Sequence, residues 1–160
     1  GSRKLLWPAF QAYVLPTLMF CASSWAPCLL RDIDVIEKVQ RRYTKTIHGL
    51  HDLPYDKRLQ ELGALTLANR RTYADMTLVF KCLHGMINCS PSALGLMVAE
   101  NSTRSAAHRL IQTRIANRAH GASFSCRAPS SWNKLPLDIV CSGSLRTFKS
   151  KLYKNLLICS

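Results

Sequence analysis

Residues 32–47, DIDVIEKVQRRYTKTI, carry the strongest helical pattern in the chain. Asp32 is a suitable N-cap, and the acidic Asp34 and Glu37 lie in the first turn, where the helix dipole favours negative charge. Gly49 follows the stretch and suits a C-terminal stop. One face is mainly apolar at alternating spacings of three and four residues, which predicts burial against other helices. Its members are Ile33, Ile36, Gln40, Tyr43 and Ile47, with Val39 widening the face.

Further helices are expected on both sides of this stretch. Residues 55–62 form a short helix between Pro54 and Gly63, and residues 67–83 form a longer one that ends at His84-Gly85. The pattern also predicts a helix around Phe10–Cys21 that Pro16 enters or breaks, and a brief helix that Ser90-Pro91-Ser92 starts and that runs through Val98. A last helix is capped by Ser144 and carries Leu145, Phe148, Leu152 and Leu156 at helical spacing.

The character of the chain changes after Glu100, where polar residues and arginines replace the apolar pattern. Residues 110–115 can alternate as a strand, Gly121 suits a turn, and residues 123–126 can form the returning strand. The fold class expected is mainly α, a helical bundle with a small β-hairpin and a C-terminal helix in the second part. The predicted organisation is a cloning scar at residues 1–2, a helical part at 3–99 and a basic hairpin-plus-helix part at 100–160. The pattern leaves open whether the two parts pack as one unit.

The chain carries 22 lysines and arginines against 9 acidic residues, a net charge of +13. Small soluble domains usually carry a net charge of about 2–8 in magnitude, so the excess points to a polyanion, either nucleic acid or an anionic membrane surface. It is concentrated in residues 101–160, which hold ten basic residues and Asp138 as the single acid. With 48% hydrophobic residues the chain can form a core, which excludes a disordered basic tail. No run of about 20 apolar residues predicts a membrane span.

Seven cysteines lie among apolar neighbours without regular spacing, which favours free thiols in a reducing, intracellular environment. Cys82, His84 and Cys89 are three candidate zinc ligands, but their spacing matches no standard zinc knuckle or finger. Buried structural thiols are therefore the preferred interpretation. No metal or other cofactor is predicted.

Enzymatic motifs are scarce. Residues 73–76, YADM, resemble the YxDD loop of reverse transcriptases, but two-metal phosphoryl transfer needs adjacent carboxylates and Met76 replaces the second one. The segment also falls within the expected helix at 67–83 rather than in a hairpin turn. No GxSxG elbow or glycine-rich phosphate loop is present. No catalytic residue is predicted, and the chain by itself is not expected to be an enzyme.

The basic residues are the remaining functional signal. Arginine suits phosphate because its planar guanidinium donates two hydrogen bonds at once. A charge run is usually only a solvated face, but the one-sided excess here favours nucleic-acid contact. Trp132 and Phe148 are expected in the core rather than stacked on bases. The candidate nucleic-acid-binding residues are Arg41, Arg42, Lys45, Arg70, Arg71, Arg104, His108, Arg109, Arg114, Arg118, Arg127 and Lys134.

Short motifs along the chain match one family in their order and spacing. They are Ser24-Trp25-x-Pro27, Asp32-Ile33-Asp34, EKVQRRYTK at 37–45, Leu53-Pro54-Tyr55-x-x-Arg58-Leu59-x-x-Leu62-Gly63, Leu67-x-x-Arg70-Arg71, Phe80-Lys81-x-Leu83-His84-Gly85, Thr103-Arg104-Ser105, Phe124-Ser125-x-x-x-Pro129-x-x-Trp132-Asn133-x-Leu135-Pro136 and Ser144-Leu145-x-Thr147-Phe148-Lys149-x-x-Leu152. Together they resemble the region after the polymerase core in LINE-type, Jockey-like non-LTR retrotransposon reverse transcriptases. The resemblance covers nearly the whole chain, from about Trp25 to Leu152.

The resemblance implies the thumb and downstream region of such an enzyme, without the polymerase carboxylates, which lie upstream. A thumb packs helices against the primer–template duplex during target-primed reverse transcription and holds it by its backbone. The implied partners are RNA, an RNA–DNA hybrid or target DNA, together with the upstream polymerase domain. The implied location is the nucleus, with a cytoplasmic ribonucleoprotein stage. No membrane partner is expected, and a homodimer is left open.

A structural or protein-interaction role is the alternative interpretation of the same residues. On that interpretation the segment braces the polymerase or dimerises, and a host could have retained it as an adaptor. The basic residues would then serve only to solvate the surface.

Overall fold

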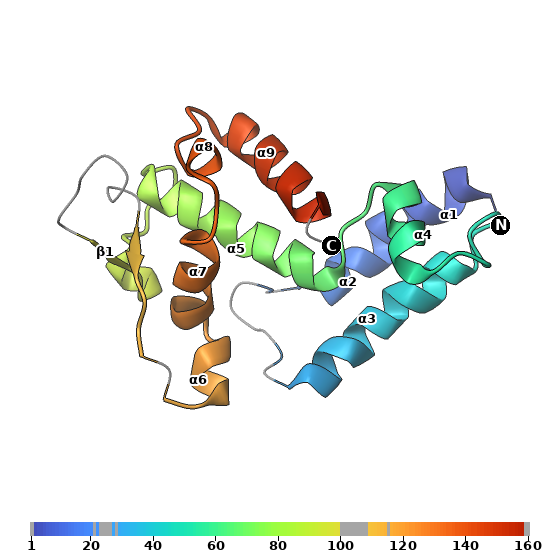
Figure 1. Ribbon diagram of the computed structural model, residues 1–160, viewed down its shortest axis with the longest axis horizontal. Coiled ribbons are helices and arrows are strands. Elements are labelled where there is room, and N and C mark those ends of the chain that lie inside the picture. The colour runs from blue at the N-terminus through green and yellow to red at the C-terminus, as the bar shows by residue number, and fades with distance from the viewer. Residues whose placement is uncertain are drawn as a thin grey trace.

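A computed structural model of the protein describes residues 2–20, 22, 27, 29–99, 109–114 and 116–158. The described residues are mainly helical and include one small antiparallel sheet, which confirms the predicted fold class (Figure 1). The α-helices are α1 (Arg3–Ala9), α2 (Leu15–Leu18), α3 (Leu30–Lys45), α4 (Tyr55–Leu62), α5 (Leu67–Leu83), α6 (Arg118–Ala122), α7 (Phe124–Trp132), α8 (Leu137–Val140) and α9 (Leu145–Ile158). The other elements are the π-helix η1 (Phe10–Val14), the 3-10 helix η2 (Ser92–Leu94) and the strands β1 (Met97–Val98) and β2 (Leu110–Ile111).

The N-terminal helix begins earlier than predicted. α1, η1 and α2 follow one another directly, so the helix starts at Arg3 rather than at Phe10. Pro8 and Pro16 lie inside this run, and each proline lacks the backbone donor that a regular helix needs. The wider π turn of η1 falls between the two prolines. Cys21, where the predicted helix ends, lies outside the described residues.

α3 confirms the strongest helix prediction but begins earlier, with Leu29 as its N-cap. Asp32, the predicted N-cap, instead lies in the first turn, because the backbone is already helical from Leu30. The predicted inward face is confirmed in outline, whereas Val39 is exposed and does not widen it. α4 has its predicted bounds and ends at Gly63 in the left-handed conformation. On α3 and just after it, Gln40 and Ile47 are buried, and Ile33, Ile36 and Tyr43 are partly buried.

α5 also has its predicted bounds and is the central helix. The Thr66 hydroxyl caps it by accepting a hydrogen bond from the Asn69 amide at 3.1 Å. α5 packs against α3, α7 and α9. In Figure 1, α7 and α9 lie on opposite sides of α5, and α1–α4 gather near its N-terminal end.

The apolar core is divided near the start of α5. One cluster joins α1–α4 and contains Phe10 and Ile47, and the other joins α5 to the later helices and contains Phe80 and Trp132. The predicted boundary between residues 99 and 100 does not coincide with this division. α5 precedes that boundary in sequence, yet it shares one core with α7 and α9, which follow it.

The small sheet pairs other strands than those predicted. β2 lies within the predicted strand 110–115, but its partner is β1, with Met97 opposite Ile111 and Val98 opposite Leu110. The returning strand predicted at 123–126 is therefore wrong.

Residues 123–126 instead begin α7. Ser123 is the N-cap of that helix, and Gly121, the predicted turn residue, lies in α6. The spacing of Phe124, Ala128 and Trp132 is helical and places all three on the second core, so the period of about 3.6 residues prevails over the strand pattern. The brief helix predicted through Val98 is also shorter than expected: η2 ends at Leu94, and β1 follows.

The C-terminal helix α9 confirms its prediction. The Ser144 hydroxyl accepts a hydrogen bond from the Thr147 amide at 3.1 Å. Phe148, Leu152 and Leu156 are buried and Leu145 is partly buried, as the helical spacing predicted.

Candidate nucleic-acid interface

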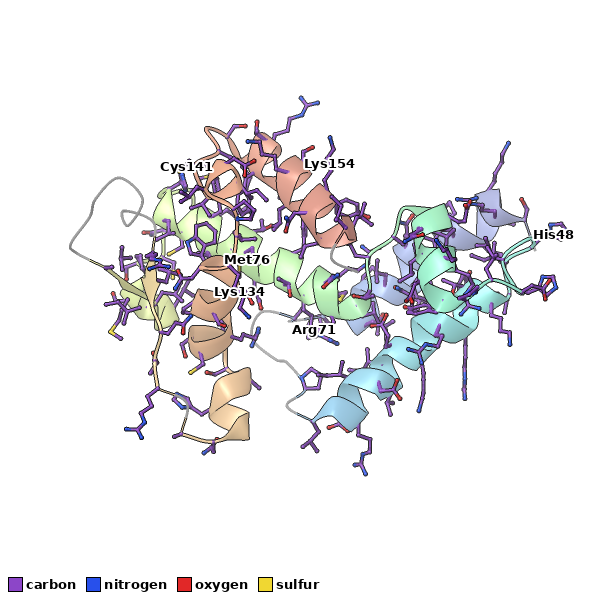
Figure 2. The ribbon with its side chains drawn as sticks, in the orientation of Figure 1. His48, Arg71, Met76, Lys134, Cys141 and Lys154 are labelled. Carbon is purple, nitrogen blue, oxygen red and sulfur yellow. The ribbon has the colours of Figure 1, made fainter. Side chains whose placement is uncertain are left out.

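The outer face of α3 carries a row of four cations. Arg31, Lys38, Arg42 and Lys45 fall in one sector of the helix at 3.6 residues per turn, opposite the buried Gln40. All four are exposed, and the row spans about 21 Å at 1.5 Å per residue. We call these four residues the α3 row. α3 lies at the edge of the molecule, and side chains extend from it into solvent (Figure 2).

One acidic residue partly neutralises the middle of this face. Lys38 Nζ lies 2.9 Å from Asp34 Oδ2, and Arg41 Nη1 lies 3.7 Å from Asp34 Oδ1. The hydrogen bond from Lys38, helped by the charges of Lys38 and Arg41, holds the pKa of Asp34 below its ordinary value. Exposed pairs of this kind contribute little to stability, so both cations remain available to exchange partners.

The C-terminal end of the α3 row keeps its full charge. Arg42 and Lys45 form no ion pair with any residue that the structure describes, whereas Arg31 Nε lies 3.7 Å from Asp32 Oδ1. The strongest positive potential of the row is therefore expected around Arg42 and Lys45.

The inner face of α3 is fixed by a buried polar cluster. The Tyr55 hydroxyl and the Leu67 amide both donate hydrogen bonds to the Glu37 carboxylate, the latter at 2.9 Å. Gln40 Nε2 donates to the Tyr55 hydroxyl at 3.1 Å and to the Leu65 carbonyl at 3.0 Å. Burial, followed by the hydrogen bond to Glu37, raises the pKa of Tyr55. The cluster joins α3 to α4 and α5, so it fixes the rotation of α3 and with it the direction of the α3 row.

Arg41 serves this packing as well as the surface. Its guanidinium carbon lies 5.0 Å from the centroid of the Tyr55 ring, and that of Arg58 lies 5.6 Å from the same centroid. Arg58 Nη2 also donates a hydrogen bond to the Arg41 carbonyl at 3.4 Å. Of the three cations predicted here, Arg42 and Lys45 are the least committed to the fold.

Two predicted site residues on α5, Arg70 and Arg71, lie partly or largely inside the fold. Arg71 is only 7% exposed, and Arg70 is partly buried. Burial lowers the pKa of both guanidinium groups, although arginine stays protonated in proteins. Neither is fully exposed, in contrast to Arg42 and Lys45 on α3.

Arg127 is likewise held inside. Its Nε lies 2.8 Å from Asp75 Oδ2, and its Nη2 donates to the Ala22 carbonyl at 3.1 Å. The predicted contact residue thus links α7 to α5 and to the segment before α3.

The remaining described candidates, Arg109, Arg114 and Lys134, are exposed and do not lie on α3 (Figure 2 labels Lys134). The Asn133 side chain joins the segment that carries Lys134 to the segment that carries Arg109. Its Nδ2 donates to the Leu110 carbonyl at 2.7 Å, and its Oδ1 accepts from the Leu110 amide at 3.1 Å. Arg109 and Lys134 flank this pair of bonds in sequence. Arg104, His108 and the side chain of Arg118 lie outside the described residues.

Sequence reasoning did not place Arg31 and Lys38 in the site. The available signal was their spacing from Arg42 and Lys45, which puts all four on one helical face. A separate group of cations, Arg146, Lys149, Lys151 and Lys154, lies along α9, on the other side of α5 from α3 (Figure 2).

The candidate zinc ligands have other contacts. Cys82 Sγ donates to the Cys89 carbonyl at 3.2 Å, and burial, more than the nearby Cys89, raises the pKa of the Cys82 thiol. The His84 ring stacks on Phe80 with 3.9 Å between ring centroids. Within the described ranges, no group of three or more Cys, His, Asp or Glu residues is placed to hold a metal ion.

The YADM segment lies in the middle of α5, as predicted, and not in a hairpin turn. Its Asp75 is buried in the ion pair with Arg127. This carboxylate is used to join two helices.

Comparison of the chain with models of known families, with curated proteins and with solved structures finds no match. Among the helices that the structure describes, none has both the length and the apolar character needed to cross a membrane.

Proposed function

We propose that the chain binds the phosphate backbone of a nucleic acid through the α3 row. The observation that carries this proposal is the pair Arg42 and Lys45, which are exposed, unpaired among the described residues and held outward by the buried cluster around Glu37. Cations fixed on a rigid helix bind phosphate at a lower entropic cost than cations on a mobile loop.

The length of the α3 row suits an extended polyanion. Duplex DNA carries one charge per about 1.7 Å of its axis with both strands counted, so a duplex length of about 21 Å carries on the order of 12 phosphate charges, more than the four cations of the row. The row consists of lysine and arginine side chains, whose donors suit the oxygens of the phosphate backbone. Contacts of this kind give affinity without sequence preference.

The sequence resemblance supports a specific setting for this binding. The motif at residues 37–45 contains both the buried Glu37 and Gln40 and the exposed Arg42 and Lys45. One motif therefore encodes both the anchor of α3 and its outer charge. On this basis we infer a non-catalytic thumb region of a LINE-type reverse transcriptase, which holds template RNA or RNA–DNA hybrid beside an upstream polymerase domain in the nucleus.

Equilibrium binding to labelled nucleic acids tests this function. The chain is titrated at low salt against an RNA–DNA hybrid, single-stranded RNA and duplex DNA of equal length. The expected result is binding to at least one of them and weaker binding after the double substitution Arg42→Gln/Lys45→Gln. If the variant binds all three nucleic acids as tightly as the wild type does, the role of the α3 row is contradicted.

A protein-interaction function has one supporting observation. Leu5, Tyr13 and Phe20 on and after the N-terminal helix are 71%, 81% and 77% exposed. Large exposed apolar side chains often mark a contact with another protein surface, here the rest of the polypeptide or a second copy. Light scattering of the wild type and of Tyr13→Ser tests this role: a dimer that dissociates on substitution supports it, and a monomer in both cases excludes self-association.

A further inference from the structure

A small cavity lies where α3, α5 and the α6–α7 segment meet, with a volume of about 180 Å³. The charged side chains that line it are Arg71 and Asp75 on α5 and Arg127 on α7. Pockets for drug-sized ligands usually measure about 300–1,000 Å³, so this cavity suits a single small group.

Arg71 is a buried cation with an unused donor. Nη2 of Arg71 is buried and has no hydrogen-bond partner in the described part of the chain. The residue as a whole is only 7% exposed. A buried polar donor without an acceptor is costly, and a buried charge without one is more so. Arg71 lies on the side of α5 that faces α3 and α7 (Figure 2).

The nearby carboxylates are occupied by other donors. Arg127 holds both oxygens of Asp75, Nε at 2.8 Å from Oδ2 and Nη2 at 3.2 Å from Oδ1. Glu37, which also acts electrostatically on Arg71, accepts from the Tyr55 hydroxyl and the Leu67 amide. No described residue is placed to accept a hydrogen bond from Nη2 of Arg71.

We propose that this cavity binds a phosphate monoanion, with Arg71 as its principal ligand. The two arginines and one carboxylate that line the cavity leave one positive charge, which matches the single negative charge of a phosphodiester. Guanidinium donors suit phosphate oxygens geometrically, and Ser131, whose side chain carries a hydroxyl donor, also lines the cavity. The inference rests on the proposed function for the source of the phosphate, a nucleic-acid strand. Free inorganic phosphate is the other source.

Inorganic phosphate is the probe for the cavity itself. Its Kd for the wild-type chain is measured by calorimetry, and urea unfolding is then followed in phosphate and in chloride of equal ionic strength. At ten times that Kd, the folding equilibrium constant should rise about elevenfold in phosphate over chloride. Arg71→Met should lose this gain, whereas Arg146→Gln, an exposed change on α9, should keep it.

Two results would overturn the proposal. One is equal stability of the wild type in phosphate and chloride, and the other is an unchanged phosphate gain in Arg71→Met. If Arg71→Met does not fold, Ser131→Leu, which fills the cavity from α7, replaces it in the same comparison. A gain retained by Ser131→Leu would likewise overturn the proposal.

The two sources of phosphate are separated by a second comparison, of hybrid binding by wild type and Arg71→Met. Tighter binding by the wild type, together with a phosphate gain, supports a strand phosphate in the cavity. A phosphate gain without any hybrid binding removes the proposed function and leaves a site for free phosphate. Hybrid binding without a phosphate gain removes the cavity proposal and leaves the α3 row.

Discussion

Arg127 on α7 holds Asp75 on α5 through both carboxylate oxygens, at 2.8 Å from Nε to Oδ2 and 3.2 Å from Nη2 to Oδ1. The Asp75 side chain is 5% exposed and that of Arg127 is 18% exposed, so the pair is largely shielded from solvent. The bidentate geometry is the form in which arginine binds a carboxylate best. The pair thus joins two helices that lie on either side of the small sheet in sequence.

Substitution of Asp75 by Asn should destabilise the chain by about 3–5 kcal/mol, because the buried Arg127 charge then loses its bidentate contact with the Asp75 carboxylate. The double variant Asp75→Leu/Arg127→Met should cost less than the sum of Asp75→Leu and Arg127→Met alone, since it removes both charges. Urea unfolding measures the free energy of unfolding of all four variants. The exposed pair of Arg3 and Glu61, at 3.5 Å, is the matched control, and Glu61→Gln should change stability by less than about 1 kcal/mol. Strictly additive losses at Asp75 and Arg127 would contradict their pairing.

Replacement of Gly95 by Ala should destabilise the chain for two separable reasons. Gly95 has a φ of +69°, and a Cβ there would lie 2.9 Å from Ser125 Cβ on α7. The left-handed conformation costs a non-glycine residue roughly 1–2 kcal/mol, and the overpacking adds about 1–3 kcal/mol. Gly49→Ala is the control, because Gly49 has a φ of +81° with nothing within 4 Å of the added Cβ. A loss at Gly95 no larger than that at Gly49 would show that the contact with α7 is unimportant.

The free energy of unfolding should fall at alkaline pH, because the buried Tyr55 hydroxyl keeps its proton in the folded state. Its pKa is raised above the ordinary value of 10.0 by burial and by the hydrogen bond to Glu37. The folded state therefore keeps a proton that the unfolded state loses, so this contribution is complete below pH 10 and is lost as the pH rises through the folded-state pKa. Urea unfolding at about pH 9 and about pH 11 should show a smaller loss in Tyr55→Phe than in the wild type. Tyr13→Phe changes an exposed tyrosine and should retain the full loss. An equal loss in Tyr55→Phe and the wild type would contradict the buried hydrogen bond.

The double variant Arg42→Gln/Lys45→Gln should weaken binding to nucleic acid and lower the salt dependence. Removing two phosphate contacts should reduce the slope of log K against log salt by about 2 in magnitude on duplex DNA. Arg146→Gln/Lys154→Gln is the matched control, because it removes the same net charge from α9. Equal effects of the two variants would indicate attraction by net charge alone rather than by the α3 row.

Helices with local signals at their ends were predictable from the sequence. Gly63 ends α4 in a left-handed conformation that glycine adopts at little cost, and Ser144 caps α9 through its own side chain. The sheet was not predictable in the same way. β2 is held by β1 and by the side chain of Asn133, 23 residues from Leu110, and no local pattern encodes such a contact.

The same distinction separates the exposed from the buried part of the candidate site. The helical period places Arg42 and Lys45 opposite Gln40, so their exposure follows from sequence spacing. The burial of Arg127 depends on Asp75, 52 residues away, and charge counting treats both as surface residues. Arg127 was therefore assigned to a basic face because its carboxylate partner is distant in sequence.

The salt dependence of hybrid binding tests the central claim most directly. The dissociation constant of the wild-type chain for an RNA–DNA hybrid is measured at several salt concentrations, from low to physiological. If the four cations of the α3 row each neutralise one phosphate, log K should fall linearly with log salt at a slope of about −3 to −4. A flat dependence, or no binding at low salt, would contradict a function in holding the nucleic-acid backbone.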